Sequence, residues 1–345
     1  MSTVRIGIVG AGNIATNAHM PAYTHCADAQ VVAVADIDFQ RAKDFAERFH
    51  LEAAYSSVEE MLDKSDIDAV DVCVWNCAHA EVSIAALRAG KAVLCEKPLS
   101  YDLESALQIQ EEVKKAGVPF LLGVPNRFYP ANHLARQLVE AGELGDIYYA
   151  KASYLRRRGT PLGWFTDRRA SGGGPVLDIG VHRIDAAWYL MGNPKPVRVS
   201  AAVSNRLGEF RTKGVDRWQG TPYPDGRYDT EDFGAGVIHF ENGAMMQFEA
   251  SWAINGPELG HTQVYGTKAG LSMDPLTIFG ERAGYLSDDR LTTAQESPFD
   301  NEIAHFVRCV QGKEQPRTPI EQACDLQRML QGIYDSGRLG REVTL

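Results

Sequence analysis

Two groups of residues in this chain have the types and spacing that proton transfer requires. Lys97 closes one predicted strand, and Asp178, His182 and Asp185 follow one another in the run DIGVHRID. A partly desolvated lysine can exchange protons near neutral pH or, when charged, stabilise an alkoxide. If the second segment is helical from Gly180, His182 and Asp185 share one face, and Asp178 reaches His182 from the turn before. A carboxylate bonded to one imidazole nitrogen fixes the tautomer and leaves the other nitrogen able to take a hydroxyl proton.

Each group also has a plainer interpretation. Lys97 could be a surface lysine paired with Glu96, its neighbour in the sequence. His182 could cap or pack at a helix start, with Asp185 serving its own helix. Position in the sequence does not decide between these alternatives, so both stay open here.

The elements that would position these groups begin with residues 4–17, VRIGIVGAGNIATN. The apolar run suits a strand buried on both faces, and the glycines that follow fit the strand-turn-helix form of a dinucleotide site. Gly10 permits the tight turn, Gly12 lets the backbone approach a pyrophosphate, and Ala15 keeps helix and strand close. The turn residues expected to contact the cofactor are Gly10, Gly12, Asn13 and Ile14.

Asp36 follows the second predicted strand, residues 30–35, close to the spacing of a ribose ligand. A carboxylate there accepts hydrogen bonds from ribose hydroxyls and repels a 2′-phosphate, and the next residue is Ile37 rather than an arginine. We therefore expect NAD in preference to NADP, with Asp36 and Ile37 beside the adenosine. The alternative is that Asp36 only caps the helix expected over residues 39–49.

Composition indicates an ordinary globular protein of about two domains. The 345 residues are 44% hydrophobic and 23% charged, and the net charge of −10 argues against non-specific binding to nucleic acid or anionic lipid. The first residues enter a strand directly, without the pattern of a signal peptide, and no later stretch is apolar over a membrane-spanning length. We expect a cytoplasmic protein without membrane or nucleic-acid partners.

The six cysteines include no C-x-x-C pair, and several fall in or beside predicted buried strands, so free thiols are expected. Cys77 and His79 lack partner ligands at metal-site spacing. We predict no metal site.

Strands and helices alternate up to residue 124, as expected of a parallel, doubly wound sheet. Further strands are expected over residues 69–75, 92–95 and 120–124, with helices over 80–89 and 102–116. Ligands bind outside the carboxyl ends of such strands. Asp36, Asn76, His79 and Lys97 would then share one edge with the glycine turn, and residues 1–124 would form an NAD-binding Rossmann domain.

Residues 125–345 have a different pattern, which predicts a substrate-binding α/β domain with an open, mainly antiparallel sheet. Strands are expected over 147–155, 197–205, 233–240, 244–252 and 262–266, with Asn242-Gly243 as a two-residue hairpin turn. Helices are expected over 130–141, 302–311 and 320–339. A sheet face without helices commonly pairs with another copy, so a homodimer or homotetramer through this sheet is expected.

A basic and aromatic stretch precedes the triple glycine of residues 172–174. Such side chains can stack on a sugar ring and bind hydroxyl or acid groups, although a run of charges is more often solvated or intersubunit. The stretch comprises Tyr154, Arg156, Arg157, Arg158, Trp164, Phe165, Arg168 and Arg169. We expect substrate contacts from Tyr154, Arg156 and Trp164, together with Lys97, Asp178 and His182.

Several motifs in order resemble the glucose-fructose oxidoreductase and inositol dehydrogenase (Gfo/Idh/MocA) family. The motifs are GAGNIA, Asp36, AHAEVSIAALRAGKAVLCEKPLS, NRFYP and SGGGPVLDIGVHRIDAAWYLMG, and they span most of the chain. The Glu-Lys-Pro tripeptide and the D-x-G-x-H-x-x-D run are the specific parts, because the glycine turn is common to many enzymes. The resemblance implies a Rossmann domain, a C-terminal α/β domain whose sheet makes subunit contacts, a nicotinamide cofactor and a sugar or polyol substrate.

The resemblance also implies roles for single residues. Lys97 matches the family's active-site lysine, and Asp178 and His182 match its catalytic acid and histidine. Glu96 and Arg127 fall where such enzymes line the nicotinamide side. The chain departs from the family at Val74-Trp75, where Thr-Pro usually precedes the asparagine that is Asn76 here. Trp75 could contact the nicotinamide, although packing in the core is the simpler expectation.

Together these features predict reversible oxidation of a secondary hydroxyl on a cyclic sugar or polyol, with hydride passing to NAD. Two other hypotheses stay open. One is a redox-cycling enzyme that retains its cofactor and ends in hydrolysis, elimination or epimerisation. The other is a non-catalytic NAD(P)-binding regulator, which would have no need of Lys97, Asp178 and His182 together.

Overall fold

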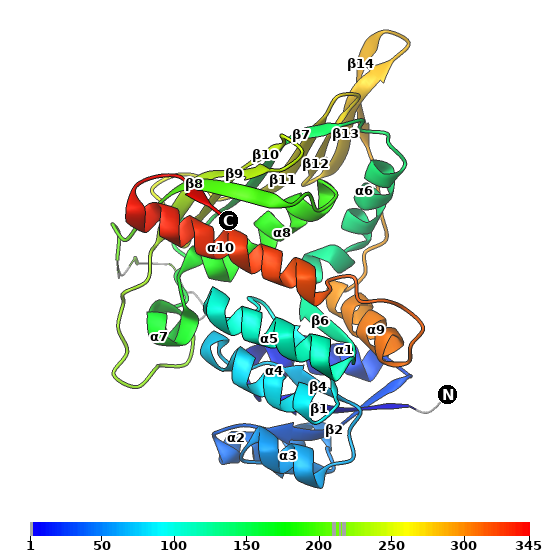
Figure 1. Ribbon diagram of the computed structural model, residues 1–345, viewed down its shortest axis with the longest axis vertical. Coiled ribbons are helices and arrows are strands. Elements are labelled where there is room, and N and C mark those ends of the chain that lie inside the picture. Colours follow the sequence, from blue (N-terminus) through cyan, green and yellow to red (C-terminus); the bar gives the residue numbers. More distant parts are fainter. Residues whose placement is uncertain (1–2, 209–211, 214, 216–218) are drawn as a thin grey trace. The chain divides into compact units, whose positions relative to one another are not determined.

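A computed structural model describes residues 3–208, 212–213, 215 and 219–345, and the chain divides into two compact units (Figure 1). Unit 1 comprises Met1–Phe128 and Glu296–Cys324, and unit 2 comprises Tyr129–Gln295 and Asp325–Leu345. The late segment 296–324 thus packs with unit 1, whereas the sequence places everything after residue 124 in the second domain. The reason is α9 (Pro298–Val310), whose Ile303, Phe306 and Val307 are buried in the same apolar cluster as β1.

Unit 1 is built on a parallel sheet in the order β3-β2-β1-β4-β5-β6. The strands are β1 (Val4–Val9), β2 (Ala29–Ala35), β3 (Ala53–Tyr55), β4 (Ala69–Val72), β5 (Ala92–Glu96) and β6 (Phe120–Gly123). Helices α1 (Met20–His25), α2 (Phe39–Phe49), α3 (Val58–Lys64), α4 (His79–Arg88) and α5 (Leu103–Ala116) alternate with them, and a π-helical turn, Ala15–His19, precedes α1. The strand order reverses between β1 and β4, which is where doubly wound sheets bind ligands.

Local chemistry explains the helix limits in unit 1. The Asp102 side chain accepts a hydrogen bond from Ser105 N at the start of α5, and Gly117 ends that helix in the left-handed region. β4, β5 and β6 are buried along their whole length, as strands covered on both faces must be. The predicted parallel, doubly wound sheet is confirmed.

Unit 2 contains a mixed, mainly antiparallel sheet, which for the described residues has nine strands in the order β14-β13-β12-β11-β7-β10-β9-β8-β15. The strands are β7 (Ile147–Leu155), β8 (Pro196–Ser204), β9 (Phe233–Phe240), β10 (Met245–Ser251), β11 (Leu259–Gly266), β12 (Gly270–Met273), β13 (Leu276–Arg282), β14 (Tyr285–Arg290) and β15 (Val343–Thr344). The helices are α6 (Pro130–Glu140), α7 (Arg168–Ser171), α8 (Val181–Leu190) and the greater part of α10 (Ile320–Leu339), and a second π-helical turn, Val176–Gly180, precedes α8.

β7 and β10 are the one parallel pair among the strands described in unit 2, with Leu155 opposite Ser251. Their carboxyl ends therefore lie side by side, which brings together the residues that follow each strand. Figure 1 shows α6 and α8 on one side of the sheet, and no described helix of unit 2 covers the other side. The predicted open sheet is confirmed.

Some elements differ from the sequence-based expectations. Phe240 and Ala244 pair through backbone hydrogen bonds, so the hairpin has a three-residue loop ending in Gly243, and the predicted two-residue turn is wrong. β4 ends at Val72 because Cys73–Trp75 leave the sheet, and β3, α3 and β12 to β15 were not anticipated. All six cysteines are free. No helix in the described part of the chain has the length and apolar character needed to cross a membrane.

Candidate active site

The glycine turn of unit 1 has the geometry that a dinucleotide requires. Gly10 has φ of +98°, and a Cβ there would lie 2.5 Å from the carbonyl oxygen of Cys73, so only glycine fits. A Cβ on Gly12 would meet no atom within 4 Å, which leaves that side of the turn open to a ligand. Asn13 is exposed and Ile14 is half-buried at the start of the helix. The turn therefore fits a pyrophosphate at the helix N-terminus.

Asp36 holds the turn in place rather than capping α2. Its Oδ2 accepts from Ala11 N at 2.9 Å, and its Oδ1 accepts from Asp38 N at 2.8 Å. The cap of α2 is Asp38, which accepts from Arg41 N, so the alternative interpretation of Asp36 as that cap is wrong. Ile37 is 89% exposed beside it, an arrangement open to an adenine ring. Arg41 Nη1 lies 3.7 Å from Asp36 Oδ2, and this cation was missed because helix geometry, not sequence adjacency, brings it there.

The segment after β4 places Trp75, Asn76 and His79 around a short 3₁₀ turn, Asn76–Ala78. Trp75 is half-buried, so it does not belong to the core as expected. His79 is buried, with Nδ1 2.7 Å from the Pro98 carbonyl and Nε2 3.1 Å from the Val74 carbonyl, and burial lowers its pKa. His79 therefore links the loops that follow β4 and β5. Cofactor contacts by these residues stay predictions.

Lys97 follows β5 at the carboxyl edge of the sheet and is half-buried. Glu96 is buried, its Oε2 accepts from Lys97 N at 3.2 Å, and its Oε1 lies 3.0 Å from His19 Nε2. The Glu96 carboxylate therefore faces the interior of unit 1. This is inconsistent with the alternative in which Lys97 and Glu96 form a pair at the surface. The catalytic role of Lys97 stays a prediction.

Arg127 lies in a buried position within unit 1. Its Nη1 donates to the Arg317 carbonyl at 3.1 Å and to Gln322 Oε1 at 2.5 Å, and Arg317 donates in return to the Arg127 carbonyl. These contacts tie the end of the first segment to the first turn of α10 and to the residues just before it. A contact with nicotinamide, which the family resemblance implies, stays a prediction.

In unit 2, Asp178 lies in the second π turn and is held by a residue that the sequence analysis missed. Trp252, fully buried at the end of β10, donates from Nε1 to Asp178 Oδ2 at 2.8 Å. A buried indole N–H needs an acceptor, so a tryptophan at the end of a predicted strand was a usable signal. Asp178 itself is half-buried.

His182 lies in the first turn of α8, four residues after Asp178 and half-buried like it. Asp185 is fully buried instead, so the two side chains predicted to share one face differ in their access to solvent. The predicted orientation of His182 by Asp178 stays a prediction. Lys97 lies in unit 1, whereas Asp178 and His182 lie in unit 2, and their action at one site belongs to the proposal below.

Tyr154 and Arg156 lie at the end of β7, beside the end of β10. Arg156 N donates to the Ser251 carbonyl at 2.8 Å, next to Trp252, and the Arg156 guanidinium lies 5.0 Å from the Tyr154 ring centre. The sheet register thus brings two predicted substrate residues to the strand end where Trp252 holds Asp178. Trp164 stacks on Phe165 with ring centres 3.9 Å apart.

Three other arginines of the stretch have side-chain partners within unit 2. Arg158 donates to Asn255 Oδ1 at 2.8 Å. Arg169 bonds Asp167, and this bond lowers the pKa of the Asp167 carboxyl to about 2 although burial opposes it. Arg168 lies 3.9 Å from the Glu231 carboxylate. These contacts indicate that most arginines of this stretch stabilise the loops of unit 2.

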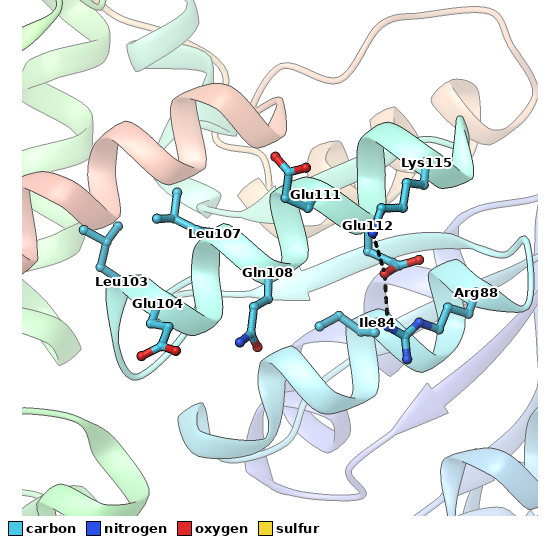
Figure 2. Close-up of a pocket in the computed structure, with 9 residues that line it drawn as sticks. All are labelled: Ile84, Arg88, Leu103, Glu104, Leu107, Gln108, Glu111, Glu112 and Lys115. Carbon is cyan, nitrogen blue, oxygen red and sulfur yellow. Dashed lines mark hydrogen bonds and ion pairs between the residues drawn. The ribbon is translucent and has the colours of Figure 1, made fainter.

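A groove of about 680 Å³ lies between α4 and α5 and contains none of the predicted site residues (Figure 2). Arg88 of α4 reaches Glu112 of α5 across it at 3.2 Å, and Lys115, one turn along α5, lies 3.7 Å from the same carboxylate. The groove is a feature of the outer helix surface of unit 1 and not part of the candidate site.

Comparisons with known proteins agree with this geometry. Residues 4–124 match the oxidoreductase family with an NAD-binding Rossmann fold, and residues 133–272 match the GFO/IDH/MocA C-terminal domain. D-glucoside 3-dehydrogenase of Escherichia coli K12 is 32% identical over 353 residues, covering 100% of this chain and 98% of that protein. D-xylose 1-dehydrogenase (NADP⁺) 2 of Haloferax volcanii is 28% identical, covering 98% of this chain and 99% of that protein.

Solved structures show the same fold. Levoglucosan dehydrogenase in complex with NADH and levoglucosan superposes with a TM-score of 0.88 at 24% identity, over 99% of each chain. An oxidoreductase domain protein from Kribbella flavida superposes with a TM-score of 0.88 at 24% identity, over 100% of this chain and 99% of that one. By its family matches, by its relatives and by its fold, the chain belongs to the Gfo/Idh/MocA family of NAD(P)-dependent oxidoreductases.

Proposed function

We propose that this oxidoreductase oxidises a secondary hydroxyl of a cyclic sugar or polyol and passes the hydride to NAD. Relatives of the chain act on a D-glucoside, on D-xylose and on levoglucosan, which are all cyclic carbohydrates or form rings. One observation carries the proposal: a carboxylate, Asp178, is fixed by a buried indole one helical turn before a half-buried histidine, His182. This arrangement suits a base and the group that orients it.

Each residue has a separate task in the proposed reaction. His182 takes the proton of the substrate hydroxyl, and Asp178 fixes its tautomer and favours the imidazolium that forms. Lys97 stabilises the developing oxyanion or shares the proton. The nicotinamide, when bound, accepts the hydride. This division requires Lys97 of unit 1 and His182 of unit 2 to meet at one substrate.

NAD is the proposed cofactor, and Asp36 is the residue that selects it. Its carboxylate is fixed by two backbone N–H groups, so it cannot turn away from a 2′-phosphate without losing them. Repulsion between these anions disfavours NADP. Arg41, 3.7 Å from Asp36, is the group that would ease this repulsion, and the NADP-using relative shows that the family accommodates either cofactor.

Substrate binding is assigned to the strand end that carries Tyr154, Arg156 and Trp164. Aromatic rings pack on the apolar faces of a sugar ring, and a guanidinium donates to hydroxyl or acid groups. A second copy of the chain is the proposed macromolecular partner. It would bind the helix-free side of the sheet, where the Tyr149 and Tyr265 rings stack at 5.3 Å, and a solution mass of two or four times 37.9 kDa would support it.

The experiment is a screen of the purified protein against cyclic polyols, aldoses, alkyl glucosides and levoglucosan, with NAD and NADP, following free NADH or NADPH. Steady NADH formation with a sugar or polyol is the expected result, and NADP should support a lower kcat/KM. Product that appears without free NADH would instead identify a redox-cycling enzyme. Cofactor binding without turnover of any substrate would identify a regulator, and both outcomes overturn the proposal.

A further inference from the structure

Unit 1 contains a buried group of ionisable side chains on elements next to the switch point of its sheet. His19 is fully buried, with Nδ1 2.8 Å from Asp71 Oδ2 and Nε2 3.0 Å from Glu96 Oε1. Asp71 and Glu96 are buried as well. An imidazole can donate from both ring nitrogens only when it is protonated. A histidine between two carboxylates therefore has the geometry of an imidazolium.

The π turn explains how this side chain arrives there. His19 ends the π-helical turn that follows the glycine turn, and the extra residue of such a turn changes the direction of the side chains after it. β4 supplies Asp71, and β5 supplies Glu96. We call the contacts of His19 with Asp71 and Glu96 the His19 bridge. It joins the helix after β1 to two neighbouring strands on the other side of the switch point.

Three further ionisable side chains surround His19, and burial favours the neutral form of each. Cys73 Sγ lies 3.5 Å from Nδ1, and burial raises the pKa of that thiol to about 12. Burial likewise raises the pKa of Tyr23 well above its usual range. Glu302 of α9 is fully buried, and neither of its oxygens has a hydrogen-bond partner among the described residues. Burial, then the charge of Glu96, raises the pKa of Glu302 well above its usual range, which favours the protonated form of Glu302.

A divalent metal is the competing explanation of these atoms. His19, Asp71 and Cys73 offer ligand atoms that all lie within 4.8 Å of one another. However, a metal on Nδ1 would have to replace the 2.8 Å contact with Asp71, and Cys73 would have to lose its proton although burial raises the pKa of that thiol to about 12. Protonation of His19 satisfies the same atoms without moving them.

We propose that His19 is permanently protonated and acts as a positioning residue, fixing Glu96 and, through Glu96, the backbone of Lys97. Glu96 Oε1 faces His19 while Oε2 accepts from Lys97 N at 3.2 Å, so one carboxylate connects the imidazolium to the lysine. The protonation of His19 stands on unit 1 alone. Its consequence for catalysis rests on the proposed function, because it assumes that Lys97 contacts substrate.

The pKa shifts agree in direction with this bridge. Burial opposes charge on His19, but the charges and hydrogen bonds of Asp71 and Cys73 together outweigh burial, and the pKa of His19 lies well above its usual range. Burial would raise the pKa of Glu96, but the hydrogen bond and charge of His19, together with nearby Lys97 and His79, outweigh burial and lower it. His305 provides a contrast in the same unit. Its Nδ1 bonds Glu314, but its Nε2 accepts from Arg317 N, which requires a neutral ring, and burial lowers its pKa.

The first test is an NMR spectrum of protein labelled with ¹⁵N in histidine, recorded from pH 6 to pH 9. Nine histidines are present, and an ordinary one with a pKa of about 6.5 is neutral at pH 9. We expect one ring that keeps both N–H protons at pH 9, and we expect His19→Gln to remove that signal while His305→Gln leaves it. Wild-type protein without any doubly protonated ring at pH 9, or with stoichiometric bound metal, would overturn the proposal. This measurement needs no activity, and it stands even where His19→Gln fails to fold.

The second test separates positioning from packing by steady-state kinetics on a substrate found in the screen. His19→Gln should lower kcat about tenfold or more and leave the Kd for NADH within about threefold, because the Glu96-Lys97 backbone loosens while the glycine turn stays intact. His305→Gln is the matched control and should leave kcat unchanged. If folded His19→Gln has the same kcat as the wild type, His19 has no positioning role. A wild-type enzyme inactive on all substrates would defeat the proposed function and leave the protonation result unaffected.

Discussion

The two π-helical turns of this protein, Ala15–His19 in unit 1 and Val176–Gly180 in unit 2, present ionisable side chains in opposite ways. In the first turn, His19 is sealed from solvent and has a carboxylate at each ring nitrogen. In the second turn, Asp178 is half-buried and accepts a hydrogen bond from the indole N–H of Trp252. Both turns follow a glycine-containing segment and precede an α-helix, so the local backbone is similar while the surroundings differ.

The difference shows how one local geometry can serve two purposes. A sealed charge must be compensated by buried partners, and removing one partner leaves an uncompensated charge in the interior. Such a group can fix positions but cannot exchange protons with a substrate. A half-buried carboxylate such as Asp178 keeps its access to ligands. We therefore assign positioning to the first turn and proton chemistry to the second.

The largest expected effect comes from removing the side chain of Lys97, whose backbone N–H bonds Glu96 of the His19 bridge. Lys97→Ala should keep NADH binding and lower kcat by about 10² to 10⁴, the range that a lost general acid or oxyanion donor commonly costs. Lys91→Ala is the matched control, because Lys91 precedes the same strand that Lys97 follows and bonds the Ile67 carbonyl instead. NADH titration and steady-state kinetics measure both effects. Turnover close to that of the wild type would remove lysine from the mechanism.

A smaller effect is expected in unit 2 from Trp252→Phe, which removes the N–H donor of Asp178 and keeps an aromatic ring in the core. A hydrogen bond to a charged group is worth about 1.5 to 3 kcal/mol, so kcat should fall about tenfold to a hundredfold with a change in its pH profile. Trp188→Phe is the control, because Trp188 Nε1 donates to the Pro194 carbonyl elsewhere in unit 2. Equal losses in both variants would indicate a packing effect and not a role through Asp178.

The same comparison explains how much of the site the sequence could predict. The glycine turn, Asp36, Lys97, Asp178 and His182 were all recognisable, because each belongs to a short motif whose spacing is local. The bridge was not, since His19, Asp71 and Glu96 are 52 and 77 residues apart in the chain and meet only after the strands pair. Neither was Trp252, which lies 74 residues from Asp178.

The fold was predictable to a similar degree and for a similar reason. Strongly apolar or alternating segments such as β7 and β9 have the predicted limits, because burial alone determines them. β13 and β14 were missed, because this hairpin exposes Tyr285 and Leu286 and has no regular apolar face. The membership of α9 in unit 1 was also missed, since it depends on a contact between chain ends that no local pattern reports.

The last prediction concerns stability and not catalysis, and it tests the protonation state of Glu302 beside the His19 bridge. Because burial raises its folded-state pKa, Glu302 favours the folded state at low pH, and this contribution is lost as pH rises above the unfolded pKa of about 4.3. Glu302→Gln should therefore gain stability relative to the wild type between pH 5 and pH 8, by at most about 1.4 kcal/mol per pH unit, as measured by denaturant unfolding. Glu314→Gln is the control, since the hydrogen bond from Arg308 lowers the pKa of Glu314, so its contribution is constant over this range and is lost only as pH falls below the unfolded pKa of about 4.3. A constant difference in unfolding free energy between Glu302→Gln and wild type over this range would mean that Glu302 is ionised in the folded state. The buried carboxylates around His19 would then need a second cation.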